Sequence, residues 1–165
     1  MNNIIAIRQA TEDDLKKIIR FECRNRHWFS QFLSAQTLEM QTEAYFRYLL
    51  RGKLQRLQYL VFSSNKELIG RFNGQILDPK ARTLEVSYRI AQDFTNQGIA
   101  KYVLKRILLV WAGCGIQEVY AQVSDHNNAS MKVLSSCGFE VEEIQTDAIN
   151  LGTMVHDCWV FRWTL

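Results

Sequence analysis

The sequence predicts a mixed α/β fold, because strand-like and helix-like segments alternate along its 165 residues. The predicted elements follow the order β-α-α-β-β-β-α-β-α-β-β. Near the middle, Thr83–Ile90 alternates apolar and polar side chains, as a half-buried strand does. A helix begins after Gly98, and another strand follows that helix. Two strands joined through a helix imply at least one parallel pair.

The N-terminal part is predicted to hold one strand and two helices. Residues 4–8 are β-prone, and Thr11 with Asp14 has the spacing of a helix capping box. In the helix that follows, Glu22 shares one face with three apolar side chains. Residues 37–51 show helical spacing, so one second helix is predicted there.

The rest of the chain is predicted to hold the other strands and two more helices. Strands are expected at 59–62, 67–76, Thr83–Ile90 and 118–123, and in two β-rich stretches that reach Leu165. Helices are expected from Gly98 to Gly113 and over residues 128–137, where Gly138 ends the second one.

Composition favours one compact domain over residues 1–165. Apolar residues make up 47% of the chain, which is enough for a sizeable core, and only one proline is present. The net charge of +3 is small and the basic residues are spread along the chain, so no nucleic-acid partner is expected. No apolar run approaches the ~20 residues of a membrane span, so no membrane partner is expected.

The cysteines and the N-terminal residues predict a cytoplasmic location. Cys23, Cys114, Cys137 and Cys158 are widely spaced without a CxxC pair, and are expected to be reduced, buried thiols. Only a short apolar patch precedes the first charges, which is unlike a secretory leader. The three histidines share no metal-binding spacing with one another or with the cysteines, so no metal site is predicted.

The residues around Gly98 are predicted to bind a phosphate group. A strand ends at Ile90, an irregular loop follows, and Gly98 opens a helix whose first turn carries Lys101. The first N–H groups of a helix lack partners within the helix and lie at its positive end, so they bind anions. Gly98 has no Cβ, which lets an anion approach the backbone closely. Taken alone, a glycine that merely starts a core helix fits this segment equally well.

This loop resembles the cofactor-binding loop of the GNAT N-acetyltransferase superfamily, Q/R-x-x-G-x-G/A, between its fourth strand and third helix. In the matching stretch TNQGIA, Gly98 and Ala100 agree with the pattern. Thr95 replaces the usual Gln or Arg, and Asn96 stands where many members have glycine. The resemblance implies that acetyl-CoA is the acyl donor and is bound through Ile90, Ala91, Asn96, Gln97, Gly98, Ile99, Ala100 and Lys101.

A second stretch, DHNNASMKVLSSCGFE, resembles the N-x-x-S segment and following Gly-Phe of the same superfamily. The matching residues are Asn127, Ser130, Gly138 and Phe139. The resemblance implies that Asn127 hydrogen-bonds the pantetheine arm, although an asparagine here also fits the N-cap of the next helix. The stretches FECRNRHWFSQF and GTMVHDCWVFRW resemble the branch with ribosomal-protein N-terminal acetyltransferases, the RimJ/RimL type.

The resemblance implies a strongly twisted central sheet of about six to seven strands flanked by about four helices. It also implies that acetyl-CoA and a primary amine are bound together and that the amine attacks the thioester directly. Glu85 lies on the strand face opposite Leu84 and Val86 and is the predicted general base, with a merely solvent-facing glutamate as the alternative. A backbone N–H near Ile90 or Ala91 is expected to hold the oxyanion.

The leaving thiolate needs a proton, and many members of the superfamily supply it from a tyrosine shortly after the Gly-Phe pair. This chain has no tyrosine after Tyr120. Ser130 is therefore the predicted substitute, as the resemblance to the ribosomal-protein branch implies.

The N-terminal resemblance favours a protein or peptide α-amine as the acceptor. A small-molecule amine, such as a polyamine or an aminoglycoside, is the alternative and predicts an acidic acceptor cleft. A non-catalytic acyl-CoA-binding sensor or scaffold is the alternative of another class, because the loop departs from the pattern and the tyrosine is missing. Both a monomer and a homodimer are compatible with the sequence.

Overall fold

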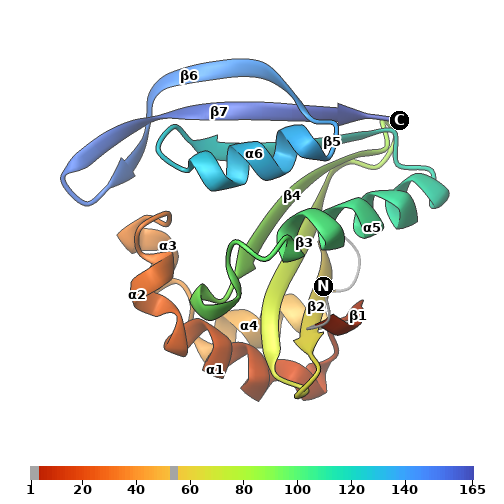
Figure 1. Ribbon diagram of the computed structural model, residues 1–165, viewed down its shortest axis with the longest axis vertical. Coiled ribbons are helices and arrows are strands. Elements are labelled where there is room, and N and C mark those ends of the chain that lie inside the picture. The colour runs from red at the N-terminus through yellow and green to blue at the C-terminus, as the bar shows by residue number, and fades with distance from the viewer. Residues whose placement is uncertain (1–3, 53–55) are drawn as a thin grey trace. The chain divides into compact units, whose positions relative to one another are not determined.

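The computed structural model describes residues 4–52 and 56–165 (Figure 1). Its strands are β1 (Ile4–Gln9), β2 (Arg56–Ser63), β3 (Leu68–Asp78), β4 (Thr83–Ile90), β5 (Glu118–Ser124), β6 (Glu140–Leu151) and β7 (Met154–Thr164). The α-helices in the same residues are α1 (Leu15–Arg24), α2 (Arg26–Phe29), α3 (Ala35–Glu39), α4 (Glu43–Arg51), α5 (Ile99–Gly113) and α6 (Asn128–Ser136).

Hydrogen bonds join the seven strands into one open sheet in the order β1-β2-β3-β4-β5-β7-β6. The pair β4–β5 is parallel, with residues 83–85 beside residues 118–120, and α5 is the connection between the two strands. The predicted mixed α/β fold with a parallel pair is therefore confirmed. None of the helices in residues 4–52 and 56–165 is long and apolar enough to cross a membrane.

The chain divides into two compact units, Met1–Asn73 with Tyr88–Ile99, and Gly74–Ser87 with Ala100–Leu165. Strands β3 and β4 each contribute residues to both units. The apolar core of the first unit consists of Ile18, Phe21, Phe29, Phe46, Leu49, Leu50, Leu60, Phe62, Leu68 and Ala91.

The predicted capping box before α1 is confirmed. The backbone N–H of Thr11 donates to the Asp14 carboxylate at 2.9 Å, and the Arg8 guanidinium donates two bonds of 2.8 Å to the same group. Arg8 therefore holds the pKa of Asp14 well below its ordinary value, with the Thr11 bond adding to the effect.

The prediction of one helix over residues 37–51 is wrong, because α3 and α4 share this stretch. Thr42 has an extended backbone, with φ −96° and ψ 163°, and its hydroxyl accepts the N–H of Tyr45 at 3.2 Å. A threonine that caps a new helix cannot also continue the preceding one. The short α2 was also missed, which gives six helices in the described residues instead of four.

In the second unit, α5 packs on the sheet through fully buried side chains. Leu84 and Val86 of β4 are 0% and 3% exposed, as their alternation predicted. Trp111 of α5 is 1% exposed and lies against Gly74 of β3, where a Cβ would approach the indole ring to 2.6 Å. The close approach of this ring to the strand therefore requires glycine at position 74.

None of the four cysteines takes part in a disulfide in the described residues, and their reduced state stays a prediction. Their predicted burial is confirmed only for Cys137 and Cys158, because Cys23 and Cys114 are exposed. Spacing along the chain does not report how deeply each cysteine is buried.

Candidate active site

The loop before α5 turns through two residues with a left-handed backbone. Asn96 has φ 58° and Gly98 has φ 76°. Asparagine adopts this conformation more readily than most residues, which explains how it stands where many members of the resembled family have glycine. A Cβ built on Gly98 would meet no atom within 4 Å, so the space in front of this backbone is open.

Two side chains brace the loop by hydrogen bonds to its own backbone. The Thr95 hydroxyl donates to the Gln92 carbonyl at 2.8 Å, and the Gln97 amide donates to the Asp93 carbonyl at 3.1 Å. Thr95, which departs from the family pattern, thus has a local structural role. The shape of the loop is set by these bonds and by Asn25, whose side-chain oxygen accepts the Gln92 N–H at 3.0 Å.

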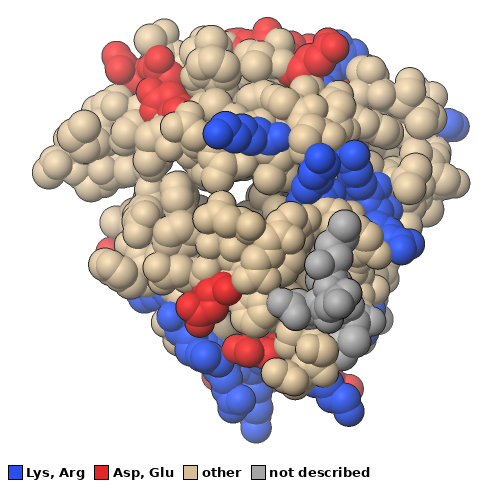
Figure 2. Space-filling model, in the orientation of Figure 1, with Lys and Arg blue, Asp and Glu red and all other residues tan. Residues whose placement is uncertain are grey.

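Basic side chains gather over α5, as Figure 2 shows. Lys101, Lys105 and Arg106 are exposed along this helix. Arg106 donates to the Tyr102 hydroxyl at 2.8 and 3.0 Å, which holds its guanidinium against the helix. Together with the positive end of the α5 dipole, these charges favour an anion near the start of the helix.

The two predicted oxyanion donors differ in the structure. The Ala91 N–H donates to the Ile69 carbonyl at 2.9 Å, so it is already used in the sheet. Successive N–H groups along an extended strand point to opposite edges, and the Ile90 N–H therefore points away from β3. This geometry removes Ala91 as a donor and leaves Ile90.

Glu85 lies half-buried on the sheet face opposite Leu84 and Val86. Gln122 of the neighbouring β5 donates to its carboxylate at 3.1 Å. The Cys158 thiol of β7 lies 3.8 Å from the other end of the same amide, the Gln122 Oε1 atom. Three adjacent strands thus fix the orientation of Glu85.

Burial raises the pKa of Glu85, and the hydrogen bond from Gln122 opposes this shift. A carboxylate with a raised pKa is a stronger base than an ordinary surface glutamate. Burial also raises the pKa of the Cys158 thiol, and the nearby Glu85 charge adds to that shift. A raised pKa favours the protonated form of the Cys158 thiol, which is a weaker nucleophile than the thiolate.

Asn127 and Ser130 lie together at the start of α6. The Asn127 side-chain oxygen accepts the Ser130 N–H at 3.2 Å, so Asn127 is the N-cap of this helix. The capping interpretation of this asparagine is thus confirmed. Only the side-chain oxygen takes part in this bond, and the capping geometry fixes the direction of the Nδ2 group.

The structure assigns the predicted residues to separate units. Glu85, Asn127 and Ser130 belong to the second unit, whereas the loop from Ile90 to Ile99 belongs to the first. Ala100 and Lys101 continue α5 into the second unit.

Sequence reasoning missed Gln122, and it also missed a buried ionic cluster in the first unit. Glu22 is 5% exposed and pairs with Arg71, which is 3% exposed, and with Arg89 at 2.8 Å. Burial lowers the pKa of Arg71, and the Glu22 charge opposes this shift. The signal was visible in the sequence, because a glutamate on the apolar face of a helix needs a buried cation as its partner.

The fold is that of a mixed α/β protein in which a glycine-opened helix connects two parallel strands, the arrangement that the resemblance to N-acyltransferases implies. Residues 5–140 match the family model described as the acetyltransferase (GNAT) domain, and the chain belongs to this family. The predicted family and the predicted enzyme class are both confirmed.

Similar proteins are found at low sequence identity. The Bacillus subtilis (strain 168) protein named "Uncharacterized N-acetyltransferase YoaA" is 25% identical over 146 residues, 85% of this chain and 81% of that protein. The structure of RimL, a ribosomal L7/L12 alpha-N-protein acetyltransferase in complex with coenzyme A, has a TM-score of 0.86 at 21% identity, covering 98% of both chains. The ribosomal-protein-S5-alanine acetyltransferase from Vibrio fischeri has a TM-score of 0.85 at 17% identity, covering 96% of this chain and 91% of that chain. These structures confirm the predicted fold.

Proposed function

We propose that the chain transfers an acetyl group from acetyl-CoA to the N-terminal α-amine of a protein or peptide. The observation that carries this proposal is the start of α5. There, Gly98 has a left-handed backbone with open space in front of it, at the positive end of a 15-residue helix. The pyrophosphate of acetyl-CoA fits such a position, and RimL, with the same fold, is in complex with coenzyme A.

The donor is held, in this proposal, by backbone and side-chain groups of the two predicted segments. The N–H groups of Ile99 and Ala100, with the Lys101 charge, bind the pyrophosphate. The Gln97 side chain supports this site from within the loop, because its amide donates to the Asp93 carbonyl. The Asn127 Nδ2 group, directed by the capping bond, donates to a pantetheine carbonyl.

Glu85 accepts the proton that the amine loses as it forms its bond to the thioester carbonyl carbon. The raised pKa that burial gives Glu85 brings its basicity closer to that of the amine, which favours the transfer. The Ile90 N–H, which points away from β3, stabilises the negative charge on the carbonyl oxygen.

Ser130 supplies the proton for the sulfur when the carbon–sulfur bond breaks. Its position in the first turn of α6 is fixed by the bond from its N–H to Asn127. The hydroxyl passes on a proton from water to the thiolate, so that it is neutral before and after the reaction.

A single carboxylate base can deprotonate an α-amine acceptor more easily than a lysine acceptor. An α-amino group has a reference pKa of about 8, whereas a lysine has about 10.4, so the α-amine reaches its neutral form more easily. The likeness to RimL and to the S5-alanine acetyltransferase also supports a protein N-terminus.

We further propose that residues 1–165 act as one catalytic domain in the cytoplasm, where the four free thiols stay reduced.

Two assays in sequence test this function. Acetyl-CoA should raise the melting temperature of the protein, because it binds the native state only. A thiol-release assay should then show turnover with peptides that begin with Ser or Ala, and none with the same peptides blocked at the α-amine. Turnover with spermidine or an aminoglycoside but not with any peptide would show that the acceptor is a small-molecule amine. Stoichiometric binding of acetyl-CoA without turnover would show that the chain is a sensor and not an enzyme.

A further inference from the structure

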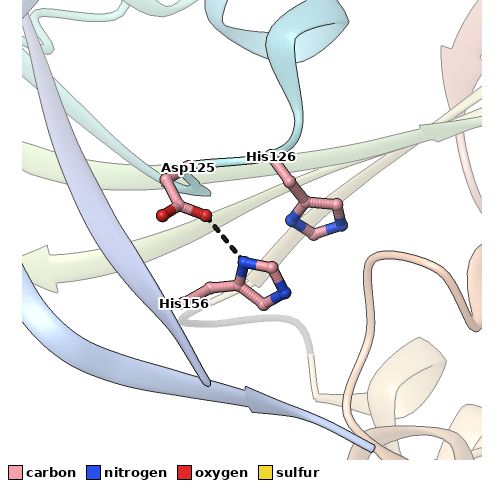
Figure 3. Close-up of side chains that lie close together, drawn as sticks. All are labelled: Asp125, His126 and His156. Carbon is pink, nitrogen blue, oxygen red and sulfur yellow. Dashed lines mark hydrogen bonds and ion pairs between the residues drawn. The ribbon is translucent and has the colours of Figure 1, made fainter. Parts of the chain in front are cut away.

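A cluster of two histidines and one aspartate forms where β5 ends beside β7. Asp125 and His126 follow β5 directly, and His156 lies within β7, far away in the sequence (Figure 3). Residues Ser124 and Cys158 are paired across the two strands, which brings the three side chains to the same place. All of these residues belong to the second unit.

The three side chains already lie close together. The Nδ1 atom of His156 lies 2.7 Å from Oδ1 of Asp125, and the rings of His126 and His156 stack with centroids 4.3 Å apart. One ligand atom from each of the three side chains can be chosen so that all lie within 4.8 Å of one another. Figure 3 shows Asp125 and His126 reaching this place from the turn after β5, and His156 from β7.

We propose that Asp125, His126 and His156 bind a divalent transition-metal ion, for which Zn²⁺ is the best-suited candidate. Imidazole nitrogen and carboxylate oxygen are common Zn²⁺ ligands, and three protein ligands leave one position open to water. Ligand atoms around a tetrahedral Zn²⁺ lie about 3.3 Å apart, so the three ligand atoms, which lie within 4.8 Å of one another, must close by up to about 1.5 Å. Side-chain rotation within the cluster, in which His126 is exposed, would supply this movement.

Neighbouring groups contact two of these side chains. The Ser124 hydroxyl lies 2.5 Å from Nδ1 of His126, and the Asp157 N–H donates to the second oxygen of Asp125 at 3.4 Å. Such outer contacts fix ligand orientation in known metal sites.

The local spacing of the histidines gave no metal motif, because the ligands come from two strands that meet only in the folded sheet. Bound metal would tie the turn after β5 to β7. That turn leads directly into Asn127 and α6, so the ion would stabilise the start of this helix. This role can be tested without an acceptor.

The test measures metal binding to the full chain after removal of any affinity tag and treatment with a chelator. Titration calorimetry with Zn²⁺ should show one ion per chain, and Co²⁺ should give visible absorption bands of a site with nitrogen ligands. His126→Ala should weaken Zn²⁺ binding by about tenfold or more, because it removes one of the three proposed ligands. The side chain is exposed, so the variant should keep the fold. His27→Ala, which alters a histidine on α2, is the matched control and should bind as the parent does.

Thermal shift provides a second readout. Zn²⁺ should raise the melting temperature of the parent and of His27→Ala, but not that of His126→Ala. Equal Zn²⁺ affinity in the parent and in His126→Ala would overturn the proposal. Loss of binding in His27→Ala to the same extent would also overturn it, because the ion would then bind elsewhere. His156→Ala, which removes another proposed ligand within β7, should also weaken Zn²⁺ binding. If that variant does not fold, the comparison of His126→Ala with His27→Ala still decides the question.

Discussion

Replacing Glu85 by glutamine removes the proposed base while keeping the size of the side chain. Glutamine can still accept the 3.1 Å hydrogen bond from Gln122, so the packing of β4 on β5 should remain. A general base contributes about 10²- to 10⁴-fold to a rate. Because Glu85 is only half-buried and water can partly replace it, we expect kcat/KM to fall by about 100-fold, or about 2.7 kcal/mol. The KM for acetyl-CoA should change little.

The stability of this variant separates chemistry from folding. Burial raises the pKa of Glu85 in the folded chain above its ordinary value of 4.5. Above pH 4.5 the unfolded chain ionises this group more readily than the folded chain does, so ionisation of Glu85 opposes folding. The stability that the raised pKa provides is fully present below the ordinary value of 4.5 and is lost at neutral pH. Glu85→Gln should therefore be at least as stable as the parent at pH 7, and its advantage should shrink toward pH 4.

The assay is thiol release with acetyl-CoA and a peptide acceptor over a range of pH. The parent should lose activity at low pH as Glu85 becomes protonated. The variant should recover part of its activity as the pH rises through about 8, where the α-amine loses its proton without help. Glu140→Gln, which changes an exposed strand glutamate, is the control and should keep parental activity. A Glu85→Gln variant with the parental kcat/KM and pH profile would refute the assignment of the base.

Three further predictions concern glycines and the buried ion pair. Gly98→Ala should cost about 1–2 kcal/mol of stability, because φ 76° is strained for alanine. It should also weaken acetyl-CoA binding about tenfold, since a Cβ enters the open space in front of the backbone. An unchanged dissociation constant in calorimetry would contradict the predicted loss of binding. Gly74→Ala should destabilise the chain by about 1–3 kcal/mol, because its Cβ would lie 2.6 Å from the Trp111 ring. Urea unfolding measures this change, and an unchanged midpoint of unfolding would show that the contact is not tight. Glu22→Ala should cost about 3–5 kcal/mol, because it leaves the buried Arg71 charge without its carboxylate partner. Glu43→Ala, at an exposed helix pair, should cost under about 1 kcal/mol.

The order and type of the main elements could be predicted because each depends on a local pattern. The alternation in Thr83–Ile90 gave the bounds of β4, and the glycine before α5 marked the start of that helix. The break between α3 and α4 was missed because Thr42 looks like any helical threonine until its hydroxyl is seen to cap the next helix. Local periodicity does not distinguish these two roles.

The candidate site was predictable only where one segment carries it. The loop at Gly98 and the pair of Asn127 and Ser130 were found from short motifs. The partner of Glu85 was not found, since Gln122 lies on another strand and approaches only through the parallel pairing of β4 with β5. The contact of His126 with His156 was missed for the same reason, because pairing of β5 with β7 brings it about.

The most direct test of acetyl transfer is mass spectrometry of a peptide incubated with acetyl-CoA and the protein. The peptide should begin with Ser or Ala and also contain an internal lysine. One acetyl group should be added at the α-amine while the lysine stays unmodified, and Glu85→Gln should slow the addition by about 100-fold. Failure to acetylate any such peptide, with acetyl-CoA bound and the protein folded, would contradict the account.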